Sequence, residues 1–212
     1  MPHSFDRLWT LKRRMTPSSS SHGGQVGSNP PCGAGVSDGW MVDAIVSQIV
    51  RASSCACGRV RCQAVGTPIL SAVCYCDDCQ AGGRQIEQLP NAARVLDDDG
   101  GTPYLTYRDD RFSCVSGAEL LVGYRIRERA PTQRFVASCC NSGLFLKFAP
   151  GHWVSAYRAR FAGDLPPIEM RTQTKCRRGD TEIPSDAPSY RRYPMKLFGR
   201  LLGSRIAMMF GQ

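Results

Sequence analysis

The sequence predicts a mainly β fold made of small antiparallel sheets, and three observations lead to this expectation. Apolar residues occur in short runs, several of which alternate with polar residues, as in strands with one buried face. Turn-forming residues separate the runs, and the chain contains 21 glycines and 14 prolines, which favour turns over long helices. Hydrophobic residues make up 42% of the chain, which is enough for a core.

The folded domain is expected over residues 51–163, where these runs are concentrated. Turn signals such as DDDGG at 97–101 and APG at 149–151 separate neighbouring runs. One internal helix is expected over residues 80–89. The expected strands are residues 60–65, 69–73, 104–107, 119–126, 134–138, 144–148 and 152–161.

The segment before this domain is expected to be a disordered leader over residues 1–39, because it is rich in Ser, Gly and Pro. It has no apolar stretch of the kind found in secretory signals, so we expect a cytoplasmic protein. No segment of the chain approaches the ~20 apolar residues of a membrane-spanning helix. Composition changes near Met41, where a short apolar run over residues 40–50 begins, and this change suggests a translation start there.

After the domain, residues 164–193 are expected to form a linker because they contain four prolines. Residues 194–210 have a helical period and predict a basic amphipathic helix. This helix either docks on its own domain, which is the simpler interpretation, or binds an anionic membrane surface. Its apolar face consists of Met195, Phe198, Leu202, Ile206 and Met209, and its basic residues are Lys196, Arg200 and Arg205.

The net charge of the chain is +9, from 27 Lys and Arg against 18 Asp and Glu. Basic residues are densest near the C-terminus, where residues 164–212 contain nine basic and five acidic side chains. Such a surplus suits an anionic partner, and nucleic acid and acidic lipid are both candidates for the tail. Tyr190, Tyr193 and Phe198 lie among these basic residues, but the sequence has no recognised DNA-reading motif.

Eleven cysteines carry most of the chemical information in the sequence. They form three groups, CACG at 55–58, CYCDDC at 74–79 and SCCNSG at 138–143. In a reducing compartment, clustered cysteines are more often metal ligands than disulfides. A tetrahedral zinc site needs four ligands, and Cys55 and Cys57 supply only two. The obvious source of the other two is the pair Cys139 and Cys140.

The second group is different in kind, because Cys74, Cys76 and Cys79 place three thiolates within six residues. Three protein ligands leave a fourth position open to water or substrate, which is typical of a catalytic zinc. Three other cysteines have no partner at ligand spacing, and we interpret them as core or incidental thiols. These are Cys62, Cys114 and Cys176.

These groups resemble a known family. CACGRVRC at 55–62, CYCDDCQ at 74–80 and CNSGL at 140–144 are similar to the cysteine motifs of the glutathione-dependent formaldehyde-activating enzymes, a family that includes centromere protein V. The resemblance covers residues 53–161 and is closest to an uncharacterised branch with a vicinal cysteine pair. It implies a β-tent fold, in which small antiparallel sheets surround two zinc ions.

The resemblance also implies a role for each group. Cys55 and Cys57, with the downstream pair, fall on structural zinc ligands, whereas Cys74, Cys76 and Cys79 fall on catalytic zinc ligands. The family reaction reversibly forms a C–S bond, joining formaldehyde to glutathione as S-hydroxymethylglutathione.

Two departures from the family pattern affect the downstream pair. The family has C-x-x-C, whereas this chain has Ala137 in place of the first cysteine, and Cys139 lies next to Cys140. Adjacent residues of an extended strand point to opposite faces. Both cysteines therefore bind one zinc only if the chain turns there; otherwise Cys140 alone completes a three-thiolate site. CNSGL also stands where the family has CGTPL, so the loop after the ligand differs.

Three functional hypotheses follow. The leading one is a zinc-dependent carbon–sulfur lyase acting on a small thiol adduct such as S-hydroxymethylglutathione. The second is a structural zinc module whose basic tail binds nucleic acid or an anionic membrane, and the third is redox chemistry at the vicinal cysteine pair. Four further side chains near these motifs have candidate roles. Arg84 is either a carboxylate-binding residue or a solvated charge, Asp77 and Asp78 either assist proton transfer or stabilise the turn, and His152 is expected to be structural.

Overall fold

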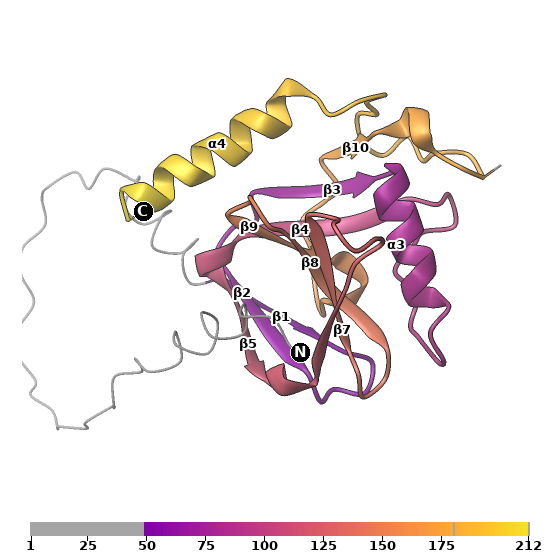
Figure 1. Cartoon of the computed structure of the whole chain (residues 1–212). Helices are drawn as coiled ribbons and strands as arrows, with labels where there is room; N and C mark the ends of the chain where they lie inside the picture. Colours follow the sequence, from indigo (N-terminus) through magenta and orange to yellow (C-terminus); the bar gives the residue numbers. More distant parts are fainter. Residues whose placement is uncertain (1–48, 180, 212) are drawn as a thin grey trace, which may run out of the picture. The chain divides into compact units, whose positions relative to one another are not determined.

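The computed structural model describes residues 49–179 and 181–211 (Figure 1). The chain divides into two units, residues 1–37 and 38–212, and every described residue belongs to the second. The expected leader over residues 1–39 and most of the apolar run that follows it lie outside the described residues.

The strands are β1 (Val50–Ser54), β2 (Arg61–Val65), β3 (Leu70–Cys74), β4 (Thr102–Arg108), β5 (Phe112–Ser116), β6 (Leu121–Tyr124), β7 (Thr132–Ala137), β8 (Ser142–Phe148), β9 (Trp153–Tyr157) and β10 (Met170–Thr172). The helices are α3 (Asp77–Glu87) and α4 (Met195–Met209), with short 3-10 turns η2 (Asp109–Arg111), η3 (Ala118–Leu120), η4 (Arg158–Arg160) and η5 (Thr174–Cys176).

The strands form two sheets. The smaller has the order β1-β2-β5, and the larger has the order β10-β3-β4-β9-β8-β7-β6. All neighbouring strands are antiparallel except β10 and β3, which run parallel. The predicted mainly β fold of antiparallel sheets is therefore confirmed for the described part of the chain.

The main core lies between the two sheets. Alternation along β2 turns Cys62 and Ala64 inward and leaves Gln63 exposed, as the period of two requires. Phe112 of β5 packs against Phe145 of β8 with ring centroids 5.2 Å apart. Aromatic pairs in this edge-to-face geometry stabilise a core by roughly 0.5–1.5 kcal/mol beyond their buried area.

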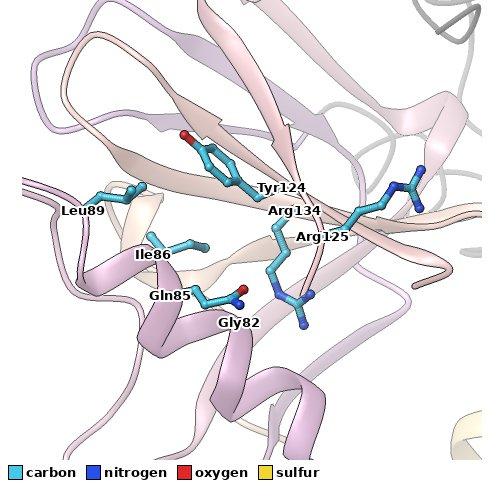
Figure 2. Close-up of a pocket in the computed structure, with 7 residues that line it drawn as sticks. All are labelled: Gly82, Gln85, Ile86, Leu89, Tyr124, Arg125 and Arg134. Carbon is cyan, nitrogen blue, oxygen red and sulfur yellow. The ribbon is translucent and has the colours of Figure 1, made fainter. Parts of the chain in front are cut away.

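Helix α3 covers the opposite face of the large sheet (Figure 1). Its buried Ile86 packs with Tyr104, Val136 and Tyr157, which project from β4, β7 and β9. A pocket of about 200 Å³ remains between this helix and strands β6 and β7 (Figure 2). The pocket is lined by Gly82, Gln85, Ile86, Leu89, Tyr124, Arg125 and Arg134.

The region expected as a linker, residues 164–193, contributes strand β10 to the large sheet. A buried polar network holds this strand in place. Arg171 is 3% exposed and donates to Tyr75 and Asp99 on one side and to Asp186 on the other. Strand β5 was also not among the expected strands; its five residues, FSCVS, do alternate between buried and exposed over Phe112 to Val115, but the run is short.

The C-terminal helix α4 was expected and is present, and it rests on the domain through one side. Leu197 packs against the small cluster of Leu70, Ala72 and Met170. Nε2 of His152 lies 2.9 Å from both the carbonyl oxygen of Leu201 and Oγ of Ser204, so this histidine has the structural contacts expected of it. No helix among the described residues has the length and apolar character needed to cross a membrane.

Candidate metal centres

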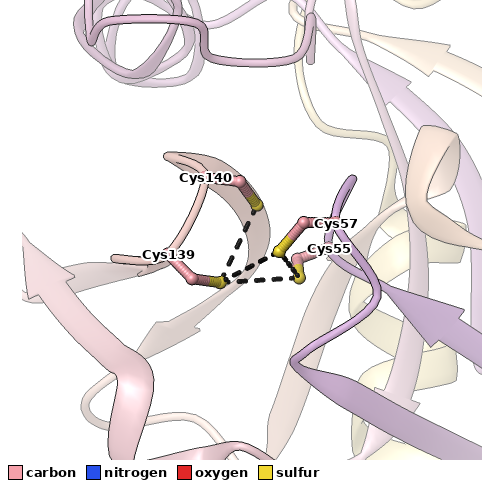
Figure 3. A group of neighbouring side chains, drawn as sticks. All are labelled: Cys55, Cys57, Cys139 and Cys140. Atoms are coloured by element: carbon pink, nitrogen blue, oxygen red, sulfur yellow. Dashed lines mark hydrogen bonds between the residues drawn. The ribbon is translucent and has the colours of Figure 1, made fainter.

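The first cysteine group joins two turns that are far apart in sequence (Figure 3). Cys55 directly follows β1, and Cys57 lies in the tight turn before β2. Gly58 closes this turn with a φ of 74°, a conformation that favours glycine. Cys139 and Cys140 lie in the turn between β7 and β8.

The four sulfur atoms have the spacing of a tetrahedral metal site. Sγ of Cys57 lies 3.5 Å from Sγ of Cys55 and 3.3 Å from Sγ of Cys139. Sγ of Cys139 lies 3.8 Å from Sγ of Cys55 and 3.9 Å from Sγ of Cys140. Zinc–sulfur bonds of ~2.3 Å in a tetrahedron place the sulfurs ~3.8 Å apart. This group can therefore hold a metal ion such as zinc.

The chain turns at the vicinal pair. The backbone N–H of Cys140 donates to the carbonyl of Ala137 at 3.3 Å, and Asn141 takes a left-handed φ of 52°. Asparagine tolerates this conformation better than most residues. Because of the turn, both sulfurs face Cys55 and Cys57 (Figure 3), as the four-thiolate alternative requires.

Hydrogen bonds to the thiols already favour ionisation in part of this group. Burial raises the pKa of Cys140, but hydrogen bonds from Ser142 and from the Cys57 backbone outweigh it and bring that pKa down to about 6. The Val60 amide donates to Sγ of Cys55 at 3.2 Å, although burial leaves the pKa of Cys55 raised. Metal binding needs deprotonated thiols, so these donors prepare the group for a cation.

The second group lies where β3 ends and α3 begins. Cys74 is the last residue of β3, Cys76 is the N-cap of α3, and Cys79 is in the first helical turn. Sγ of Cys76 accepts the backbone N–H of Cys79 at 3.4 Å. The three sulfurs lie within 4.8 Å of one another and can hold a second metal ion.

The start of a helix suits thiolates, because free N–H groups and the helix dipole stabilise negative charge there. Hydrogen bonds from Cys74 and Cys79 lower the pKa of Cys76 to about 2. The same hydrogen bonding to Cys76 is the largest cause of the raised pKa of Cys74, about 11. The surroundings of this group therefore favour a thiolate at Cys76.

Two tyrosines from distant parts of the chain contact this second group. The Tyr193 hydroxyl, just before α4, lies 3.7 Å from Sγ of Cys74. The Tyr104 hydroxyl of β4 donates to Sγ of Cys79 at 3.7 Å. Desolvation and the three nearby thiols raise the pKa of Tyr193, so its hydroxyl is protonated near neutral pH. Sequence reasoning missed both contacts, because nothing in the local pattern relates these tyrosines to the cysteines.

The two aspartates between the ligands face outward. Asp77 pairs with Arg178 at 2.8 Å and Asp78 with Arg127 at 3.4 Å, with all four side chains largely exposed. These contacts fit the turn-stabilising interpretation better than proton transfer.

The other residues considered in the sequence lie away from both groups. Arg84 is exposed on α3 and does not line the pocket beside that helix. Cys62 and Cys114 are buried opposite each other on β2 and β5, and Cys176 lies in η5. None of these three cysteines joins either metal-binding group.

Comparison with known proteins gives little more. No protein-family profile matches the chain, and no curated protein matches it. One similar solved structure is that of a Rhodobacter sphaeroides protein determined by structural genomics. It is 17% identical, with a TM-score of 0.39, and the match covers 54% of this chain and 91% of that one.

Proposed function

We propose that the chain binds two zinc ions and that its second centre is a carbon–sulfur lyase site acting on a small thiol adduct such as S-hydroxymethylglutathione. The supporting observation is the asymmetry of the two groups. The first brings together four thiols, whereas the second brings together three thiols and the Tyr193 hydroxyl. Closed four-ligand sites are typically structural, and three-ligand sites are typically catalytic.

Zinc at the second centre would supply Lewis acidity, by binding a substrate sulfur as thiolate or by polarising an aldehyde oxygen. The protein supplies the proton chemistry. In the synthetic direction the thiol loses its proton, a C–S bond forms to the aldehyde carbon, and the former carbonyl oxygen gains a proton. The Tyr193 hydroxyl, 3.7 Å from Sγ of Cys74, would donate that proton and be reprotonated from solvent, which receives the proton that the thiol loses; the reverse reaction returns both protons. No further reactant is needed.

The test has two parts. Metal analysis of the purified protein should give close to two zinc ions per chain. Magnetisation-exchange NMR with ¹³C-formaldehyde and glutathione should then show faster interconversion with S-hydroxymethylglutathione in the presence of the protein. A Cys79→Ser variant should lose this acceleration, whereas Cys176→Ser, outside both groups, should keep it. Two bound zinc ions without acceleration would refute the lyase assignment.

A second candidate function rests on helix α4. Its outer face is apolar and exposed, and the chain beyond Asp186 contains five basic residues and no acidic one. An exposed apolar stripe beside positive charge suits an anionic membrane surface better than nucleic acid. Vesicles containing phosphatidylserine should therefore bind the protein, and a Phe198→Ser, Leu202→Ser, Met209→Ser variant should not bind them. Binding that is equal in both proteins would refute this role. The exposed apolar residues of the helix are Met195, Phe198, Leu202, Ile206 and Met209.

A further inference from the structure

The most unusual polar group of the described domain is the guanidinium of Arg134. This side chain of β7 is 1% exposed. Only Nη2 has a hydrogen-bond partner, the carbonyl oxygen of Asp78 at 2.6 Å. Nε and Nη1 are buried and make no hydrogen bond of standard geometry, although the Tyr157 hydroxyl interacts with this side chain, and no carboxylate among residues 49–179 and 181–211 pairs with it. Burying an unpaired charge costs several kcal/mol, roughly, even after relaxation.

The fold makes room for this group. Arg134 extends beneath α3, towards Gly82 (Figure 2). A Cβ atom at position 82 would overlap Nε and Cζ of Arg134. Gly82 therefore allows a close approach of the helix backbone to the guanidinium, at a helix position where glycine is otherwise unfavourable by ~1 kcal/mol.

A chain of buried groups leads from Arg134 to the second cysteine group. The accepting carbonyl belongs to Asp78, the residue before Cys79. Tyr104 and Tyr157 have ring centroids 5.2 Å apart, and the Tyr104 hydroxyl donates to Sγ of Cys79. Burial is the main cause of the raised pKa of both phenols, and each also responds to the charges of Arg134 and Cys79. The two tyrosines therefore lie between the guanidinium and the thiols.

We propose that Arg134 is the buried counter-charge of the second metal centre. A divalent zinc with three thiolates has a formal charge of −1, and one guanidinium brings the sum to zero. This charge balance favours binding of the metal and keeps the open position receptive to an anionic sulfur. Arg134 acts here as a positioning residue, through Tyr104, Tyr157 and the backbone of Asp78. The inference rests on the proposed zinc site at Cys74, Cys76 and Cys79.

The test is a zinc titration against a competing chelator, with the two sites distinguished by the Cys79→Ser variant. Arg134→Met, which keeps the length but removes the charge, should weaken the second site by about 10–100-fold. The first site should be unchanged and reports that the protein is folded. Arg134→Lys should recover at least part of the lost affinity. Arg127→Met is the matched control, because it removes an exposed arginine that contacts the same Asp78, and it should change the affinity less than threefold.

The outcomes separate the two proposals. If the wild type takes up a single zinc ion, the proposed function fails and the inference fails with it. If it takes up two and Arg134→Met binds both with unchanged affinity, only the inference is overturned. A lysine variant as weak as the methionine variant would also overturn it, because shape rather than charge would then matter. Should Arg134→Met fold poorly, Arg134→Gln is used, and the gain in thermal midpoint on loading the second site replaces the titration, with the same expected loss.

Discussion

Replacement of Cys139 by serine tests the first metal centre most directly. Sγ of Cys139 lies within 3.9 Å of each of the three other sulfurs of the first group. We therefore expect Cys139 to be a metal ligand. Structural zinc sites bind with about 10–16 kcal/mol, and an equal share for each of four thiolates is about 2.5–4 kcal/mol. The variant should therefore bind the first zinc ~10²–10³-fold more weakly.

The same loss should appear in stability, because zinc that binds only the folded state stabilises it by mass action. For a chain of this size, each kcal/mol shifts the thermal midpoint by roughly 2–4 °C. The midpoint at fixed free zinc should therefore fall by roughly 5–15 °C. Zinc-buffered titration and thermal unfolding in one buffer measure both quantities.

The control for this experiment is Cys176→Ser, which removes a thiol outside both groups. Cys140→Ser should behave like Cys139→Ser. A Cys139→Ser protein with wild-type zinc affinity, beside a Cys140→Ser protein that has lost it, would refute the four-thiolate site and support the three-thiolate alternative.

Three further predictions concern the second centre and Asp97, which lies in the DDDGG turn before β4. Tyr193→Phe should retain two zinc ions but lose about 10²–10⁴-fold in the rate of adduct interconversion; an unchanged rate would exclude the phenol as proton donor. Cys74→Ser should remove one zinc ion while the far-ultraviolet circular dichroism stays that of the wild type, and global unfolding would instead indicate a structural site. Desolvation and nearby Asp99 raise the pKa of Asp97 to about 6 from 3.8, so its carboxylate destabilises the fold as pH rises from about 4 through 6. Asp97→Asn should stabilise the protein at pH 7.5 by less than ~1 kcal/mol, because the side chain is partly solvated, and should have no effect at pH 3.5; chemical denaturation at both pH values measures this, and an equal effect at both would contradict it.

The sequence was sufficient to predict features that depend on local pattern. The turn at Cys55 to Gly58 and the strand-to-helix junction at Cys74 to Cys79 are both encoded within a few residues, so the cysteine groups could be located. The alternation in β2 likewise revealed its buried face. The period of α4 revealed an apolar face, but the structure leaves that face exposed and contacts the domain through Leu197 instead.

Features that depend on tertiary contact could not be predicted. Arg134 stands in an alternating strand, where a charged side chain normally faces solvent, and only the packing of α3 places it in the interior. Tyr193 lies 119 residues from Cys74. Strand β10 has three residues and is held by Arg171 through partners more than ten residues away in sequence, so its own sequence contains no strand signal.

The two centres differ in what their loss would do to the fold, and the reason is topological. Cys55 and Cys139 are 84 residues apart, so a metal there ties the β1–β2 turn to the β7–β8 turn and closes a long loop. Cys74 and Cys79 are five residues apart and connect only the end of β3 to the start of α3. In a chain-entropy treatment, closing the longer loop removes about 2.5 kcal/mol more freedom from the unfolded chain. A metal ion at the first group would therefore stabilise the packing of the two sheets, whereas one at the second group would add little to the fold, which is the difference expected if the proposed chemistry belongs to the second group.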